Sequence, residues 1–166
     1  PADVIGADVR GLPIIPDRSR EPTLRACLDN LDWLEDPWTL TYTGNLSLPR
    51  ALFERVGGFS DDFVGWGLED IDLGVRLHRG GGRFVFSRFA IGWHVVDPDE
   101  TGWRNPFRER EPTIERFGGY LTNLSILERR HRDDPAVQGY VTRSRADIDE
   151  TCAKPMTVGI EMGGEA

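Results

Sequence analysis

Residues 58–82 read GFSDDFVGWGLEDIDLGVRLHRGGG. The first ten residues are dense in glycine, aromatic and acidic residues, which predicts a loop. Three acids then follow at Glu69, Asp70 and Asp72, before apolar residues at helical spacing. A helix is therefore predicted to begin near Glu69, because the positive end of the helix dipole favours negative charge in the first turn. The glycine run at 80–82 is predicted to end this helix.

The residues around Trp66 suit the binding of a carbohydrate. Gly65 and Gly67 flank the indole and allow a ligand or another backbone to approach closely. The flat apolar face of tryptophan suits stacking on a sugar ring. Adjacent helical positions point about 100° apart, so Glu69 and Asp70 are expected to have different tasks. One could act as a general base while the other binds a hydroxyl or a backbone amide. The alternative is an ordinary helix start beside a core tryptophan.

The rest of the chain predicts alternating strands and helices. Before the quoted stretch, the patterns predict strands over 2–9 and 39–48, and helices over 22–35 and 49–56. After it, they predict strands over 83–87 and 89–96, a polar loop over 97–112, and helices over 113–132 and 135–148. Thr113 is the expected N-cap of the longer helix. Together these elements predict an α/β fold with mixed strand directions.

Composition narrows the classes of partner. The 166 residues carry 20 basic and 28 acidic side chains, a formal net charge of −8. This balance argues against a nucleic-acid partner and against an anionic membrane surface, since both require a basic face. It is compatible with divalent metals, which carboxylates bind well. Cys27 and Cys152 match no CxxC pattern and are expected to be free thiols in a reducing compartment. With no leader or spanning segment visible, we expect the cytoplasm, or the membrane periphery, as the location.

Residues 44–82 resemble a known family at several points in order. These are Gly44-Asn45-x-Ser47, then Arg55-Val56-Gly57-Gly58-Phe59, then Gly65-Trp66-Gly67-x-Glu69-Asp70-x-Asp72-Leu73, then Arg76-Leu77 before a glycine turn. The stretch resembles the acceptor-side region of GT-A glycosyltransferases, in particular the galactosyltransferase C-terminal region shared with many family-2 bacterial enzymes. The resemblance implies a GT-A-like C-terminal half with a mixed sheet, followed by a helical extension.

The same resemblance implies roles for individual residues. Asp70 resembles the general base that deprotonates an acceptor hydroxyl, and Glu69 resembles the acid that holds acceptor hydroxyls. Trp66 resembles the residue at the donor–acceptor junction. Further residues expected to bind substrate are Asn45, Phe63, Gly65 and Gly67. The implied reaction is metal-dependent and inverting, from a nucleotide-diphospho-sugar donor, expected to be a UDP-sugar, to a glycan or other hydroxyl acceptor.

A metal ligand is also implied by the resemblance. His94 lies at the position of a histidine that completes a Mn²⁺ (or Mg²⁺) site in the family. A half-buried strand histidine bonded to a backbone carbonyl is the alternative. Asp97 and Asp99 are interpreted as a loop acid pair, and His78 and His131 as surface residues. Arg104, Arg108 and Arg110 would suit a diphosphate but equally a solvated charge run.

The donor-binding N-terminal half of the family is not recognisable in the sequence. We therefore expect residues 1–112 to form an acceptor and catalytic half, 113–150 a helical extension and 151–166 a flexible tail. An N-terminal half on another chain, or a second copy, would complete the donor site. The alternative functions are a non-catalytic glycan- or protein-binding module derived from a glycosyltransferase, and a structural dimer paired through sheet edges.

Overall fold

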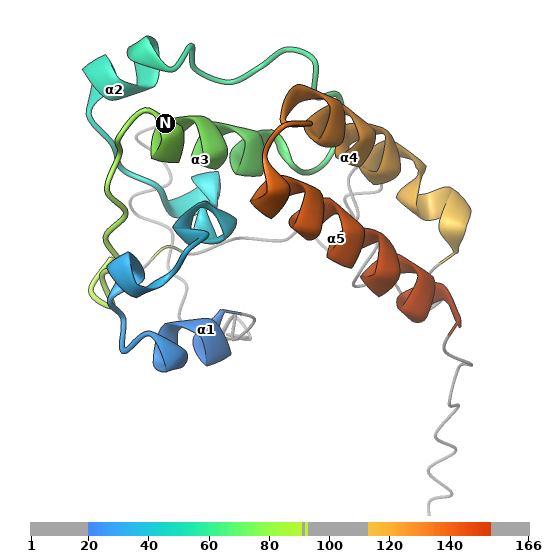
Figure 1. Ribbon diagram of the computed structural model, residues 1–166, viewed down its shortest axis with the longest axis horizontal. Helices are drawn as coiled ribbons and strands as arrows, with labels where there is room; N and C mark the ends of the chain where they lie inside the picture. Colours follow the sequence, from blue (N-terminus) through green and yellow to red (C-terminus); the bar gives the residue numbers. More distant parts are fainter. Residues whose placement is uncertain (1–19, 91, 93–112, 154–166) are drawn as a thin grey trace, which may run out of the picture.

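The computed structural model describes residues 20–90, 92 and 113–153. Figure 1 shows short helices at the N-terminal side, a central helix α3, and a pair of longer helices, α4 and α5. Within this part of the chain, no helix is long and apolar enough to cross a membrane. Cys27 and Cys152 are free thiols, as predicted.

The helix predicted over 22–35 is divided into two short helices. Helix α1 (Glu21–Ala26) ends where the backbone turns left-handed, with φ of 50° at Leu28 and 61° at Asp29. The Asn30 side chain then accepts a hydrogen bond from the Asp32 amide at 3.2 Å and starts the 3₁₀ helix η2 (Leu31–Trp33). The apolar spacing of the sequence is still satisfied, because the buried residues of both helices share one cluster, namely Leu24, Cys27 and Leu31.

The strand predicted over 39–48 is wrong. Two 3₁₀ helices, η3 (Pro37–Leu40) and η4 (Thr43–Asn45), cover half of it. Pro37 stands in the first turn of η3, where its missing N–H removes no helical hydrogen bond. The Thr39 hydroxyl donates to the Asp36 carbonyl at 2.7 Å, and the Asn45 amide donates to the Tyr42 carbonyl at 3.1 Å. These local bonds close tight turns in place of an extended ladder.

The α/β fold with a GT-A-like mixed sheet is contradicted for the described residues, which contain helices and no strand. The segment 83–87 does alternate, with Phe84 and Phe86 half-buried and Val85 exposed. However, a strand requires a neighbouring strand to pair its backbone groups, and no such neighbour lies among the described residues. Phe84 and Phe86 instead pack by their side chains against the cluster of α1 and η2. The predicted strands 2–9 and most of 89–96 lie outside the described residues.

Glu69, Asp70 and Asp72 are called the acid cluster below. The helices that precede and contain it lie where the sequence predicts them. Helix α2 (Arg50–Arg55) follows Pro49, and Gly57 stops it with a φ of 85°. Helix α3 (Glu69–Arg79) begins at the predicted residue and ends at the glycine run. It packs closely on η3, since a Cβ at Gly74 would lie 2.4 Å from Thr41 Oγ1 and 2.9 Å from the Trp38 carbonyl.

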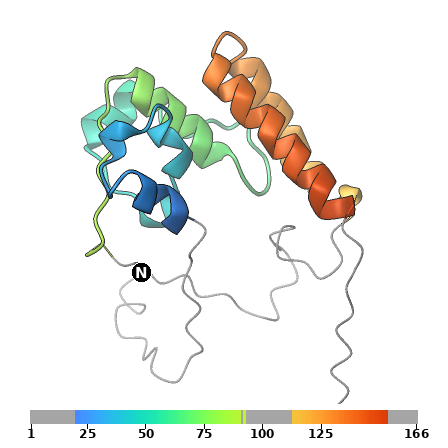
Figure 2. The same cartoon turned by 60° about the horizontal axis from the view of Figure 1, so that its bottom comes forward.

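The C-terminal region is a helical hairpin beside α3. After η6 (Ile114–Phe117), helix α4 (Gly118–Arg130) and helix α5 (Pro135–Ala153) lie side by side (Figures 1 and 2). Asp134 caps α5 by accepting hydrogen bonds from the amides of Ala136 and Val137. Helices were thus correctly predicted here, with α5 longer than the expected 135–148.

One hydrophobic cluster, called the main cluster below, joins the hairpin of α4 and α5 to the preceding helices. It combines η3 and α3 with α4 and α5 through Trp38, Leu68, Ile71, Val75, Leu124, Leu127, Val137 and Val141. The boundary at 112 and the tail from 151 remain predictions. The shared cluster nevertheless means that α4 and α5 support the start of α3.

Candidate active site

The loop before α3 has a constrained backbone. Gly65 and Gly67 have φ of 85° and 97°, and Leu68 is left-handed at 76°. A left-handed φ at a side chain such as leucine costs roughly 1–2 kcal/mol. Leu68 is also 2% exposed and belongs to the main cluster, so packing stabilises the strained residue. This turn sets where α3 begins and therefore where Glu69 and Asp70 stand.

Asp70 is a half-buried carboxylate at the start of α3. Burial, followed by the neighbouring Glu69 charge, raises the pKa of Asp70 from 3.8 to about 6. Its Oδ1 accepts a hydrogen bond from the Ile71 amide at 2.8 Å, which acts in the opposite direction. A carboxylate with this pKa is ionised at neutral pH yet basic enough to take a proton from a hydroxyl.

Glu69 has a carboxylate oxygen that no group in the described part of the chain satisfies. Among the described residues, no hydrogen-bond donor contacts its buried Oε2. A buried acceptor without a partner costs about 1–3 kcal/mol. With no donor from the described residues in contact, this oxygen is suited to accept a hydrogen bond from a ligand hydroxyl.

Trp66 lies against an aromatic residue of α4. Its ring centroid is 5.5 Å from that of Tyr120, with the planes tilted by 33°. Burial raises the pKa of Tyr120, although hydrogen bonds with Tyr140 and Ser144 oppose this, and the Asp70 charge raises it further. Tyr120 therefore lies within electrostatic reach of Asp70. The structure thus brings Trp66, Tyr120 and Asp70 into one neighbourhood.

Asn45 and Phe63 have structural contacts. The Asn45 side-chain amide donates to the Ala90 carbonyl at 2.8 Å and so connects η4 to residue 90. Phe63 is half-buried against the main cluster. Their predicted roles in substrate binding remain predictions, as do those of Gly65 and Gly67.

The predicted metal ligand lies outside the described residues. This applies to His94, to Asp97 and Asp99, and to the arginines at 104, 108 and 110. In the ranges 20–90 and 113–153, no three His, Cys, Asp or Glu side chains are grouped to hold a metal ion. The described residues alone therefore do not form a metal site.

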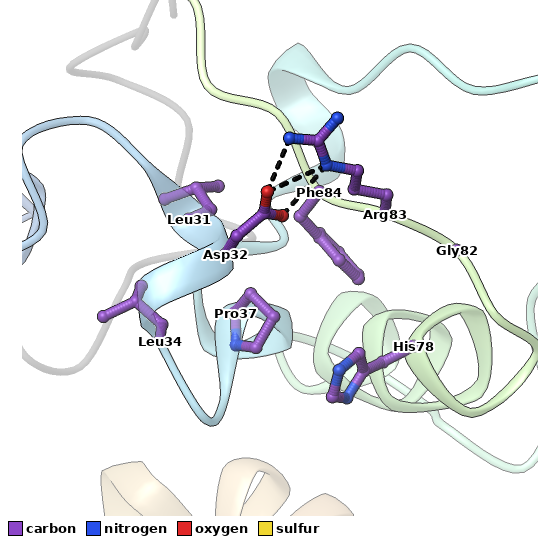
Figure 3. Close-up of a pocket in the computed structure, with 8 residues that line it drawn as sticks. All are labelled: Leu31, Asp32, Leu34, Pro37, His78, Gly82, Arg83 and Phe84. Atoms are coloured by element: carbon purple, nitrogen blue, oxygen red, sulfur yellow. Dashed lines mark hydrogen bonds and ion pairs between the residues drawn. The ribbon is translucent and has the colours of Figure 1, made fainter.

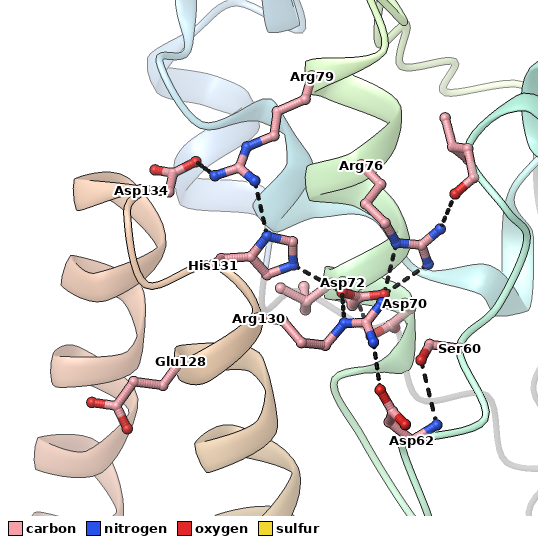
Figure 4. A network of polar contacts seen from close by, with 12 residues as sticks. Ser60, Asp62, Asp70, Asp72, Arg76, Arg79, Glu128, Arg130, His131 and Asp134 are labelled. Carbon is pink, nitrogen blue, oxygen red and sulfur yellow. Dashed lines mark hydrogen bonds and ion pairs between the residues drawn. The ribbon is translucent and has the colours of Figure 1, made fainter.

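Asp72 is the centre of a buried ionic network that the sequence pattern did not predict (Figure 4). Its Oδ2 accepts from Arg76 Nε and Nη2 at 2.9 and 2.7 Å. Its Oδ1 lies 2.8 Å from His131 Nε2 and 3.3 Å from Arg130 Nε. Burial alone would raise the pKa of Asp72, but the hydrogen bonds from His131 and Arg76 outweigh it and lower the pKa. The network joins α3 to the end of α4.

The prediction of His131 as a surface residue is wrong, since its side chain is 4% exposed. Its Nδ1 lies 3.1 Å from Arg79 Nη1, which can only donate, so Nδ1 accepts and Nε2 carries the proton toward Asp72. His78 is exposed, as predicted. It borders a surface pocket with Asp32, Pro37, Arg83 and Phe84 (Figure 3), at the opposite end of α3 from Glu69.

The sequence contains a pattern that could have indicated Tyr120, Asn123 and His131 as residues with specific partners. Tyr120, Asn123, Leu127 and His131 follow one another at helical spacing, on the stripe of α4 that also contains Leu124. Polar residues inside an apolar stripe are usually satisfied by specific partners. The partners of Asn123 and His131 lie on the loop and helix of the acid cluster, which periodicity alone cannot reveal.

Comparison with known proteins covers the same part of the chain. Residues 25–95 match a family model described as the N-terminal domain of galactosyltransferase. This stretch is similar to glycosyltransferases. The description does not confirm the C-terminal-region assignment or the GT-A fold expected from the sequence. No solved structure matches the chain.

Curated relatives agree on the general activity. A validoxylamine A glucosyltransferase of Streptomyces hygroscopicus subsp. jinggangensis (strain 5008) is 46% identical over 49% of this chain. An uncharacterized glycosyltransferase, YfnE, of Bacillus subtilis (strain 168) is 36% identical over 42% of it. A chondroitin synthase of Escherichia coli is 33% identical over 61% of it. These matches cover 19%, 18% and 13% of the respective relatives, so this chain spans less than a fifth of their length.

Proposed function

We propose that this chain carries the acceptor-activating part of an inverting glycosyltransferase. The reaction would transfer a sugar from a nucleotide-diphospho-sugar, a UDP-sugar in the first instance, to a hydroxyl acceptor such as a glycan. One observation supports this above the others: two adjacent carboxylates begin α3, Asp70 with its pKa raised to about 6 and Glu69 with a buried oxygen that no donor among the described residues satisfies. The similarity to glycosyltransferases over 25–95 supports the class of reaction.

Asp70 would act as the general base. It would take the proton of the acceptor hydroxyl as that oxygen forms a bond to the anomeric carbon. The bond from this carbon to the nucleoside diphosphate would break with its electron pair, and the diphosphate would leave from the opposite face. One displacement of this kind inverts the anomeric configuration. Asp70 would release the proton to solvent, from its half-buried position, before the next turnover.

Glu69 and Trp66 would orient the acceptor. The unsatisfied Glu69 oxygen would accept a hydrogen bond from a second hydroxyl of the acceptor. Trp66, held against Tyr120, would offer its apolar face to a sugar ring. Holding the acceptor in this way supplies the orientation that a displacement between two bound molecules requires.

The metal in this proposal depends on His94. A bound Mn²⁺ or Mg²⁺ would neutralise the charge of the departing diphosphate. Calorimetric titration of UDP in the presence of Mn²⁺, on the unsubstituted chain and on His94→Ala, tests this part separately. Binding that is lost in the variant supports His94 as a ligand, and equal binding in both removes His94 from the proposal.

The acceptor side is tested by binding and by transfer. The unsubstituted chain, Glu69→Gln, Trp66→Ala and the control Glu54→Gln are screened against a glycan array, and bound glycans are then offered labelled nucleotide sugars. Glu54 is a suitable control because it is an exposed acid in α2. We expect Glu69→Gln and Trp66→Ala to bind glycans more weakly than the control. We also expect Asp70→Asn to abolish transfer. Glycan binding without transfer, once a donor-binding half is supplied, would establish the non-catalytic module, and the absence of binding would overturn the acceptor site.

A further inference from the structure

Asn123 is a buried amide outside the segment 25–95 that matches the galactosyltransferase family model. It lies in α4 and is 1% exposed. Its partners lie in the loop at residues 64–67, inside the matched segment 25–95. A buried polar side chain that reaches a distant loop is either part of the packing alone or a support for that loop. Its contacts favour a support.

The amide of Asn123 bonds to the loop on both sides of Trp66. Its Oδ1 accepts from the Val64 amide at 3.3 Å. Its Nδ2 donates to the carbonyls of Val64 at 3.2 Å and of Gly67 at 2.9 Å. One planar amide therefore supplies both the acceptor and the donors that this backbone requires. The backbone before and after Trp66 is anchored to α4.

The anchored loop has a conformation that requires support. Gly67 has a φ of 97°, and a Cβ there would lie 2.8 Å from the Tyr120 ring. Leu68 follows with its strained left-handed φ of 76° and leads directly into Glu69. The hydrogen bond to the Gly67 carbonyl is thus one residue away from the strained position. Loss of this bond would allow the loop to relax and the first turn of α3 to move.

We propose that Asn123 is a positioning residue for the acceptor site, which holds Trp66 and, through Leu68, sets the place of Glu69 and Asp70. Helix α4 would then contribute to the site by holding the Trp66 loop in place. The kinetic consequence of this inference rests on the proposed function. The structural consequence does not, because the order of the loop can be measured without any transfer reaction.

The first test uses hydrogen exchange on the unsubstituted chain. Val64 is 75% exposed, so a backbone amide without an internal partner would exchange quickly at this position. If Asn123 holds the loop, the Val64 amide exchanges as slowly as the amides of α4. Fast exchange at Val64 beside slow exchange in α4 overturns the proposal, and this measurement depends on no variant folding.

The second test uses Asn123→Leu and Asn123→Asp, with Thr122→Ala as the control. Leucine removes all three hydrogen bonds, while aspartate keeps the acceptor for Val64 but places an oxygen against two carbonyls. Thr122 is the exposed neighbour on the same helix, and its hydroxyl donates to the Gly118 carbonyl within α4. We expect both Asn123 variants to shift the Trp66 indole NMR signal and to abolish the slow exchange of Val64. The control should change neither, and variants that match the control overturn the proposal.

Kinetics then separate positioning from packing. A displaced first turn should lower kcat by about tenfold or more in the folded variants and raise the acceptor KM. Unchanged kcat and KM in folded Asn123 variants would limit Asn123 to packing. If the unsubstituted chain shows a slow Val64 amide but no transfer to any acceptor once a donor-binding half is supplied, the proposed function fails while the positioning of the loop stands.

Discussion

Asp72 Oδ1 and His131 Nε2 lie 2.8 Å apart, although the two residues belong to different helical units of the chain. Both are buried, with 0% and 4% of their surfaces exposed. The pair joins the helix that presents the acid cluster to the end of α4. Arg79 continues the connection to Asp134 at 2.7 Å and so reaches the cap of α5. The helical hairpin is therefore bonded to α3 by charge as well as by apolar packing.

Removal of His131 should destabilise the fold. His131→Ala leaves a cavity and removes one hydrogen bond from a fully buried carboxylate, which should lower the free energy of unfolding by about 2–4 kcal/mol. His78→Ala, an exposed histidine of α3, should change it by less than about 0.5 kcal/mol. Urea unfolding of both variants measures the difference. Equal midpoints for the two variants would contradict the buried pair.

The rate of transfer should depend on the ionisation of Asp70. A general base acts only when deprotonated, and its pKa is raised to about 6. We therefore expect kcat/KM to rise with pH below about 6, by up to tenfold per pH unit, and to level off above it. Asp70→Asn should lower the plateau by about 100-fold or more. A rise centred near 4, where an ordinary aspartate titrates, would contradict the shifted pKa.

The same shift predicts that Asp70 reduces stability at neutral pH. Its folded pKa of about 6 exceeds the ordinary value of 3.8, so the folded state binds the proton more tightly. The stabilising effect of protonation is complete below pH 3.8 and is lost as the pH rises through 6. Asp70→Asn should therefore be more stable than the unsubstituted chain at pH 8, by about 1–2 kcal/mol after allowance for partial exposure.

This stability difference should narrow toward pH 4, which thermal unfolding across the pH range can follow. Asp61→Asn, an exposed neighbour in the same loop region, is the control and should show little change at either pH. An Asp70→Asn variant that is less stable than the unsubstituted chain at pH 8 would show that ionised Asp70 makes a favourable contact in the folded state.

Gly74 should tolerate no side chain. Alanine favours a helix over glycine by about 1 kcal/mol, but a Cβ at Gly74 would lie 2.4 Å from Thr41 Oγ1 and 2.9 Å from the Trp38 carbonyl. Because one of these atoms is backbone, we expect Gly74→Ala to lower stability by about 1–3 kcal/mol. Gly119→Ala in α4, where no atom lies within 4 Å of the added Cβ, should leave stability unchanged or raise it. Calorimetric melting temperatures that shift alike would contradict the close packing of α3 on η3.

The sequence by itself determined the local features of the acid cluster. Helix α3 begins at Glu69 because acids, apolar spacing and a terminal glycine run all agree over a few neighbouring residues. The same local signals correctly predicted α2 and the presence of α4 and α5. The resemblance of residues 44–82 indicated a glycosyltransferase, which the family match over 25–95 supports.

Tertiary structure decided what depends on partners distant in the sequence. A strand is defined by the neighbouring strand that it pairs with, which lies elsewhere in the sequence. The pattern of residues 83–87 and 39–48 therefore predicted strands, whereas in the described part of the chain 83–87 is an unpaired segment and 39–48 contains 3₁₀ turns. In the same way, the burial of His131 depends on Asp72, and the conformation of the Trp66 loop depends on Asn123. Hydrogen bonds and charges act over a few ångströms in space, and only the packing of α4 on α3 brings these groups within that range.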